Sequence, residues 1–151
     1  MIDYKDRPEE YDYLKYYTVV HRYFRKKYEL TREELDLILF LMSERIFNKR
    51  KFQEFNELLM WDRKRFDNML DNGWISIFRA PSDGISARYE LSYKARRMVR
   101  QLYKTIINKE IPQLPERNPM FKKEVGFSDK VYRNFIKKMN KETKTIRRKS
   151  K

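Results

Sequence analysis

Apolar residues recur every three or four positions through residues 9–72, a stretch that contains neither glycine nor proline. That spacing is the period of an amphipathic helix. Residues that favour helix ends divide the stretch into four predicted helices. The first runs from Pro8 to about Lys27, and the second starts at Thr31, in a capping box with Glu34, and has an apolar face that reaches Ile46. The third runs from an Asn48 cap to about Leu58. The fourth runs from an Asp62 cap to Asn72 and is ended by Gly73.

A β-hairpin is predicted directly after the fourth helix. Residues Trp74–Arg79 alternate in polarity and are rich in strand-forming residues, Ala80–Gly84 form a turn, and Ile85–Leu91 return as a second strand. Ser92 then caps a fifth helix that runs to about Asn108, with an apolar stripe at helical spacing. The predicted hairpin is therefore flanked by helices.

The C-terminal part of the chain has a different pattern. Residues 109–127 contain three prolines and Gly126, which predicts a linker, with one short helical turn at Asn118-Pro119. Ser128 caps a last predicted helix over residues 128–142. The basic tail, residues 143–151, is expected to be disordered.

The order of these elements predicts the fold class. Three helices followed by a hairpin and a further helix are typical of a winged helix-turn-helix, a mainly α fold with a small β-hairpin wing. We expect residues 1–108 to form this domain. In such domains the last helix before the hairpin enters the major groove of DNA, and the wing lies at the backbone or the minor groove.

The residues of the fourth helix suit contact with DNA bases. Its predicted buried stripe leaves Arg63, Lys64 and Asn68 exposed, with Arg65 at the margin. Arginine and lysine recognise guanine, and asparagine recognises adenine. Asp67 and Asp71 share the exposed face and repel phosphates, so we expect only part of this face to contact DNA.

Backbone contacts are predicted on both sides of the fourth helix. Lys49 and Lys51 begin the third helix, where the helix dipole also favours phosphate. Arg79 and Arg88 flank the turn of the hairpin on opposite strands. Arginines at a strand edge also protect against aggregation, so a purely structural role for this pair stays open.

The charge balance favours a polyanionic partner. The chain of 151 residues has 36 Lys and Arg against 22 Asp and Glu, a net charge of +14. Much of this charge is terminal, because residues 137–151 carry eight bases and a single acid, Glu142. Duplex DNA is therefore the predicted partner, although a basic tail can also be merely solvated.

Other functional classes find little support in the sequence. There are no cysteines, so disulfides and thiolate metal sites are excluded. The single histidine, His21, and the absence of a phosphate-binding loop or an H-E-x-x-H motif argue against an enzyme. We expect no cofactor and no metal. We also expect no membrane segment or signal peptide, hence a cytoplasmic location.

Three stretches resemble the MarR family, the multiple-antibiotic-resistance type of winged-helix transcription regulator. They are Leu30-Thr31, Leu70–Ile75 and Tyr89–Arg96, and the resemblance covers about residues 11–108. The last stretch is similar to the family's leucine-threonine-x-lysine-glycine-arginine run, with Ser92 for threonine and Ala95 for glycine.

The resemblance implies a homodimer, formed by the first and fifth helices, that binds pseudo-palindromic DNA. It places Arg63, Lys64 and Asn68 in the major groove and a wing arginine in the minor groove, and it is compatible with a small-molecule effector. The family's wing has an aspartate closely followed by arginine, whereas here Asp83 and Arg88 are five residues apart. The helix at 128–142 lies outside the resemblance.

Two alternatives remain open from the sequence. Winged helices also serve as protein-interaction modules in polymerase complexes and other assemblies. The bulky segment Leu58–Trp61 and the acidic Asp67 and Asp71 fit that role better than DNA reading. The 11 tyrosines and two tryptophans are also compatible with stacking on single-stranded nucleic acid.

Overall fold

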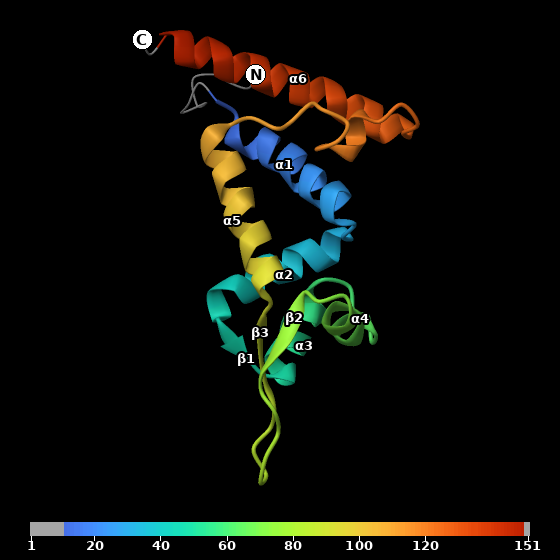
Figure 1. Cartoon of the computed structure of the whole chain (residues 1–151), viewed down its shortest axis with the longest axis vertical. Helices are drawn as coiled ribbons and strands as arrows, with labels where there is room; N and C mark the ends of the chain where they lie inside the picture. Colours follow the sequence, from blue (N-terminus) through green and yellow to red (C-terminus); the bar gives the residue numbers. More distant parts are fainter. Residues whose placement is uncertain (1–10, 150–151) are drawn as a thin grey trace, which may run out of the picture. The chain divides into compact units, whose positions relative to one another are not determined.

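A computed structural model describes residues 11–149. The described chain is mainly helical with one small three-stranded antiparallel sheet (Figure 1), a combination compatible with the predicted winged helix. Contacts divide the chain into two compact units, which we call the central unit (residues 30–103) and the terminal unit (residues up to 29 and from 104 onward). The predicted boundary at residue 108 therefore differs from the observed division, because the first helix packs with the C-terminal segment.

The central unit follows the predicted order of elements with one addition. Its helices are α2 (Arg32–Glu44), α3 (Lys49–Leu58), α4 (Arg65–Asp71) and the first part of α5 (Tyr93–Asn108). Its strands are β1 (Ile46–Phe47), β2 (Ile75–Arg79) and β3 (Arg88–Leu91). The strands lie in the order β1-β3-β2, so β3 is central, and Figure 1 shows the β2–β3 hairpin extending beyond α3 as a narrow ribbon.

The start of α2 confirms the predicted capping box, but its end does not match the prediction. The Thr31 hydroxyl accepts from Glu34 N, and the Glu34 carboxylate accepts from Thr31 N. The helix stops at Glu44 because Arg45 adopts φ 60° and ψ −75°. Ile46, predicted on the apolar face of this helix, instead pairs with Glu90 in the sheet.

One hydrophobic core holds the helices of the central unit to its sheet. Phe52 of α3 meets Phe66 of α4 edge to face, with ring centroids 4.9 Å apart, and Phe66 meets Tyr89 of β3 in the same way at 5.0 Å. Fully buried residues from α2, α4 and α5 complete the core: Leu35, Leu37, Ile38, Leu41, Met69, Ala95 and Met98. Phe66 therefore fixes α4 to both α3 and the sheet.

The terminal unit contains α1 (Tyr13–Tyr28), the end of α5, the 3-10 helix η2 (Pro119–Phe121) and α6 (Phe127–Lys149). Asp12 caps α1 by accepting from Lys15 N at 3.2 Å, and Tyr11 is not helical. The helix therefore begins later than the predicted Pro8, which itself lies outside the described residues. In Figure 1, α1 and η2 both lie against α6, in agreement with their contacts.

The predicted linker is a packed segment rather than a spacer. Ile111 is buried, and the Asn140 side chain both donates to its carbonyl at 2.8 Å and accepts from its N–H at 3.0 Å. The predicted short turn after Asn118 is confirmed, with the Asn118 side chain accepting from Met120 N at 3.1 Å. These bonds satisfy backbone groups that proline-rich segments otherwise expose to water.

The last helix is longer than the sequence predicts. It continues past Glu142 to Lys149, so the expectation of a disordered tail is wrong for residues 143–149, and residues 150–151 lie outside the described part. Thr143 is buried and donates to the carbonyl of Lys109. Arg147 donates to Glu110 at 2.8 Å and to the Asn108 carbonyl at 2.9 Å. The tail's charge is therefore arranged along a helix.

Candidate nucleic-acid interface

The approach to α4 is shaped by Asp62. Its carboxylate accepts from Lys64 N at 2.9 Å, and its carbonyl accepts from Arg65 N at 3.3 Å. Arg63 and Lys64 therefore form a turn, and the helix itself begins at Arg65 and spans seven residues. Asp62 caps this turn instead of the helix, which places the candidate recognition helix later than the predicted start.

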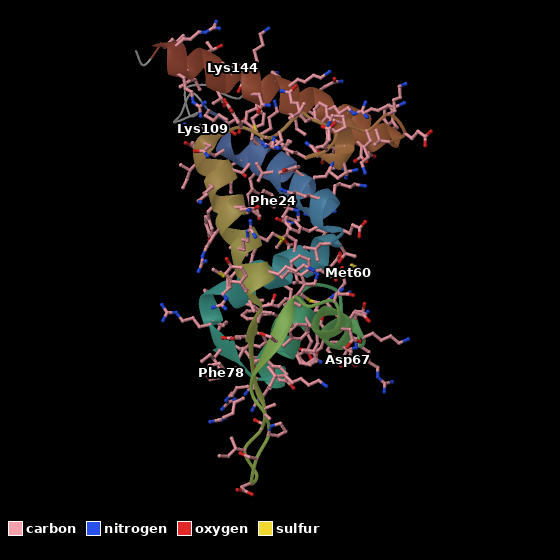
Figure 2. The ribbon with its side chains drawn as sticks, in the orientation of Figure 1. Phe24, Met60, Asp67, Phe78, Lys109 and Lys144 are labelled. Atoms are coloured by element: carbon pink, nitrogen blue, oxygen red, sulfur yellow. The ribbon has the colours of Figure 1, made fainter. Side chains whose placement is uncertain are left out.

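The exposed face of α4 and its preceding turn has mixed charge. Arg63, Lys64 and Asn68 are all exposed, as predicted, while Phe66 and Met69 point into the core. Asp67 and Asp71 are exposed on the same helix, and Figure 2 shows Asp67 on the outside of α4. The exposed cations Arg63 and Lys64 lie in the turn before the helix, whereas Asp67 lies in its first turn and Asp71 is its last residue.

Arg65 does not belong to this exposed face, contrary to the predicted DNA contact. Only 8% of its surface is exposed. Its guanidinium turns inward and donates to Asn56 Oδ1 and to the carbonyls of Met60, at 3.0 Å, and Leu59, at 3.4 Å. Asn56 in turn donates to the Asp62 carbonyl at 3.0 Å. Arg65 therefore braces the turn between α3 and α4 and is removed from the candidate contacts.

The C-terminal end of α4 is held by α5. The ammonium of Lys94 donates to the carbonyl of Asn72 at 3.2 Å and lies 3.9 Å from the ring centre of Trp74. A cation beside these carbonyls is favourable because they carry the negative end of the helix dipole. Lys94 is the lysine of the MarR-like stretch, and its position gives that residue a structural role at α4.

The first turn of α3 carries the predicted lysines. Asn48 caps this helix by accepting from Lys51 N at 2.8 Å. Lys49 is exposed, with its ammonium 5.1 Å from the centre of the Phe66 ring, and Lys51 lies 3.4 Å from Glu54. Arg50, which the sequence analysis did not select, is exposed on the same turn. Lys49 and Arg50 are thus more available for a ligand than Lys51.

The hairpin places its two arginines opposite each other. Arg79 of β2 pairs in register with Arg88 of β3, just beyond an irregularity after Ile77. Side chains of directly opposed residues share one face of a sheet. Arg79 is exposed and Arg88 is half-buried. Like charges that lie directly opposite each other on neighbouring strands repel, and an anion bound between Arg79 and Arg88 would relieve that repulsion.

A hollow of about 730 Å³ adjoins α4 and its preceding turn. Its lining combines the exposed face with residues from the start of α2: Thr31, Glu33, Glu34, Met60, Trp61, Asp62, Arg63, Arg65, Asn68 and Asn72. Three carboxylates in this lining oppose binding of a polyanion within the hollow itself. Met60 and Trp61 in this lining are 78% and 56% exposed, and Leu58 at the end of α3 is 73% exposed, which is unusual for large apolar side chains.

The fifth helix uses most of its apolar stripe inside the chain. Ala95, Met98, Val99 and Leu102 are at most 2% exposed. Ile107, at 71%, and Tyr103, at 59%, are the exposed remainder of the predicted dimer seam. The surface that α5 offers to a second copy is thus smaller than the sequence pattern suggests.

Three buried tyrosines of the terminal unit, Tyr11, Tyr16 and Tyr23, have raised pKa values. Burial raises the pKa of Tyr23 to about 12, with a further increase from Tyr28 and a smaller opposing effect of Arg117. Burial also raises the pKa values of Tyr11 and Tyr16. Among residues 11–149 no group of three His, Asp or Glu side chains is arranged to hold a metal ion. No helix in that range is both long and apolar enough to cross a bilayer.

No protein-family model, curated protein or solved structure matches this chain.

Proposed function

We propose that the central unit is a winged helix that binds duplex DNA, with the start of α4 toward the major groove and the β2–β3 hairpin as its wing. The observation that carries this proposal is the exposure of Arg63, Lys64 and Asn68 at the end of α4 that follows the α3–α4 turn. In helix-turn-helix proteins the N-terminal residues of the recognition helix contact the base edges.

The remaining basic groups suit contacts with the DNA backbone. Lys49 and Arg50 are exposed at the N-terminal end of α3, where free backbone N–H groups also attract phosphate. Arg79 and Arg88 extend the positive charge onto the wing. Asp67 in the first turn of α4 and Asp71 at its last residue oppose phosphate, so the proposed base contacts are limited to Arg63, Lys64 and Asn68.

The proposed role is transcription regulation by a homodimer, as in the MarR family that the sequence resembles. The exposed part of the α5 stripe, Tyr103 and Ile107, supports a dimer seam there. Light scattering at micromolar protein concentration tests the oligomeric state. A dimer mass that persists in Ile107→Glu would place the seam elsewhere, and a monomer mass for the wild type contradicts the dimer.

A second candidate function is a protein-interaction module. The exposed Met60 and Trp61, which share a hollow with Glu33 and Glu34, and the exposed Leu58 favour this role, because a protein partner would bury them and they gain nothing from phosphate. Under this alternative, Trp61→Ala abolishes partner capture, and Arg63→Ala leaves any DNA affinity unchanged.

Fluorescence anisotropy with labelled duplex DNA, repeated over a range of salt concentrations, separates the two candidates. Arg63→Ala and Lys64→Ala are compared with Arg97→Ala, which removes an exposed cation of α5 outside the proposed interface. Loss of a base contact should weaken binding about 5- to 150-fold, equivalent to about 1–3 kcal/mol. Loss of a phosphate contact should lower the salt slope by about 0.9.

The control decides what a loss of affinity means. We expect Arg97→Ala to bind DNA within about twofold of the wild type, since general electrostatic attraction depends on many charges. Equal losses in all three variants would show that net charge, and not α4, governs binding. Unchanged affinity in Arg63→Ala and Lys64→Ala would remove α4 from the interface and contradict the proposal.

A further inference from the structure

A second hollow in the central unit, of about 480 Å³, has a different chemistry from the one beside α4. It lies among the end of α2, β1, β3 and α5. Its lining is Leu41, Met42, Arg45, Ile46, Glu90, Leu91, Arg96 and Arg100. Three guanidinium groups and four apolar side chains thus surround a volume within the usual range, about 300–1,000 Å³, for small-ligand sites.

The hollow lies toward the β1 edge of the sheet, whereas α4 lies at the β2 edge. In the sheet order β1-β3-β2, the strand β1 forms one edge, and α4 contacts β2 at the other edge. The arginines of this hollow therefore do not extend the basic surface of α4. They form a positive site that does not include the residues of the α4 face.

The arginines are not neutralised by the chain itself. Glu90 is the single carboxylate of the lining, and none of the ion pairs recorded among residues 11–149 involves Glu90 or any of the three arginines. Arg96 and Arg100 are four residues apart, so they project from the same face of α5. Like charges at this spacing repel each other, and an anion between them removes the repulsion.

Arg96 carries a more specific sign of a missing acceptor. Its Nε atom is shielded from solvent and, in the described part of the chain, has no hydrogen-bond partner. A buried N–H group without an acceptor is unfavourable, so most such groups in proteins are paired. If the guanidinium rotates toward the hollow, an oxyanion can accept from Nε and Nη together, the bidentate geometry that arginine prefers.

The backbone conformation of Arg45 also indicates that the hollow is a binding site. This residue ends α2 with φ 60° and ψ −75°, a conformation that side chains rarely adopt. Strained non-glycine residues often occur at binding sites. Here the strain places an exposed arginine at the rim of a hollow whose floor is apolar, with Leu41 and Leu91 almost fully buried.

We propose that this hollow binds a small organic oxyanion, a carboxylate or phosphate monoester with an apolar body, through Arg96, Arg100 and Arg45. The oxyanion pairs with the guanidinium groups, and the apolar body lies against Leu41, Met42, Ile46 and Leu91. Glu90 opposes the anion and sets an upper limit on its affinity. The site does not depend on the proposed DNA binding, and short duplex DNA enters its test only as a competing ligand.

The test uses the full chain and follows arginine Nε–H signals by NMR during titration with benzoate, phenyl phosphate, inorganic phosphate and the neutral analogue benzamide. The Arg96 signal is identified by its loss in Arg96→Gln. We expect benzoate or phenyl phosphate to shift this signal in a saturable way, and benzamide to leave it in place. Calorimetry then gives the affinity of each variant.

The variants separate a built site from general charge. Arg96→Gln should weaken binding of the tighter organic anion by about tenfold or more, because a charge-assisted bidentate pair is lost. Arg97→Gln removes an exposed arginine of the same helix that does not line the hollow, and it should change the affinity less than twofold. Glu90→Gln should tighten binding, an effect that a misfolded variant cannot produce.

Several outcomes would overturn the proposal. An Arg96 signal unmoved by every anion, or equal losses in Arg96→Gln and Arg97→Gln, would show that the hollow binds none of them specifically. If inorganic phosphate bound as tightly as phenyl phosphate, the apolar part of the ligand would contribute nothing to binding, contrary to the proposal. A shift caused by short duplex DNA, with none from small anions, would make this a backbone-phosphate contact and contradict the small-ligand assignment.

Discussion

Arg65 and Arg63 lie two residues apart, and the structure gives them opposite roles. The Arg65 guanidinium is buried and holds Asn56 and the carbonyls of Leu59 and Met60, whereas Arg63 is exposed. Arg65→Ala should therefore destabilise the central unit, and Arg63→Ala should not. The pair makes a matched test because both changes remove the same charge from the same segment.

The magnitude follows from the bonds that are lost. Hydrogen bonds from a charged donor contribute about 1.5–3 kcal/mol each, and a buried acceptor left without a donor costs about 1–3 kcal/mol. The two carbonyls are partly accessible and regain water, but Asn56, at 0% exposed, does not. We expect Arg65→Ala to lower the free energy of unfolding by about 3 kcal/mol. Arg63→Ala should stay within about 0.5 kcal/mol of the wild type.

Urea unfolding followed by tryptophan fluorescence measures this difference in the right part of the molecule. Both tryptophans, Trp61 and Trp74, lie in the central unit, so their emission reports its unfolding even if the terminal unit unfolds separately. The reasoning would be refuted by an Arg65→Ala protein as stable as the wild type, or by equal destabilisation in Arg63→Ala.

Two further predictions concern the terminal unit. Thr143→Ala removes a buried hydroxyl that donates to the carbonyl of Lys109 and lies 3.0 Å from the carbonyl oxygen of Met139, and it should destabilise this unit by about 1–2 kcal/mol in denaturation followed by circular dichroism. The exposed Thr145→Ala should change stability by less than about 0.5 kcal/mol, and equal effects would contradict a packed tail. For Tyr23, the folded pKa of about 12 exceeds the unfolded value near 10, so its stabilisation is complete below pH 10 and is lost as the pH rises through 12. Between pH 10 and 12 the free energy of unfolding should therefore fall with pH less steeply in Tyr23→Phe than in the wild type, and the two slopes should differ by about 1.4 kcal/mol per pH unit. Equal slopes would contradict the raised pKa of Tyr23.

Local signals in the sequence predicted much of the central unit correctly. The Thr31–Glu34 capping box, the Asn48 cap and the hairpin before Ser92 all depend on neighbouring residues, and the structure contains each of them. The strand β1 was missed because two residues are too short to show alternation. The end of α2 was missed because the backbone conformation of Arg45 has no signature in residue type.

The errors at the candidate sites have a common physical cause. An arginine looks alike in sequence whether it faces solvent or is buried with acceptors, so Arg65 was grouped with Arg63. The hollow proposed to bind an oxyanion joins Arg45, Arg96 and Arg100 from distant positions, and helical spacing within α5 reveals only the Arg96–Arg100 pair. Likewise, the basic composition of residues 143–149 predicts disorder, yet Thr143 and Arg147 find partners near residue 109.

The central claim, that the start of α4 lies in the groove of duplex DNA, is tested most directly by cleavage of DNA from a single position. The chain has no cysteine, so Asn68→Cys can carry one iron–EDTA group, and Arg97→Cys serves as the control. The proposal predicts cuts clustered in a short run of the bound duplex for position 68 and only weak, scattered cuts for position 97. Bound DNA that position 68 leaves uncut, or that both positions cut equally, would contradict it.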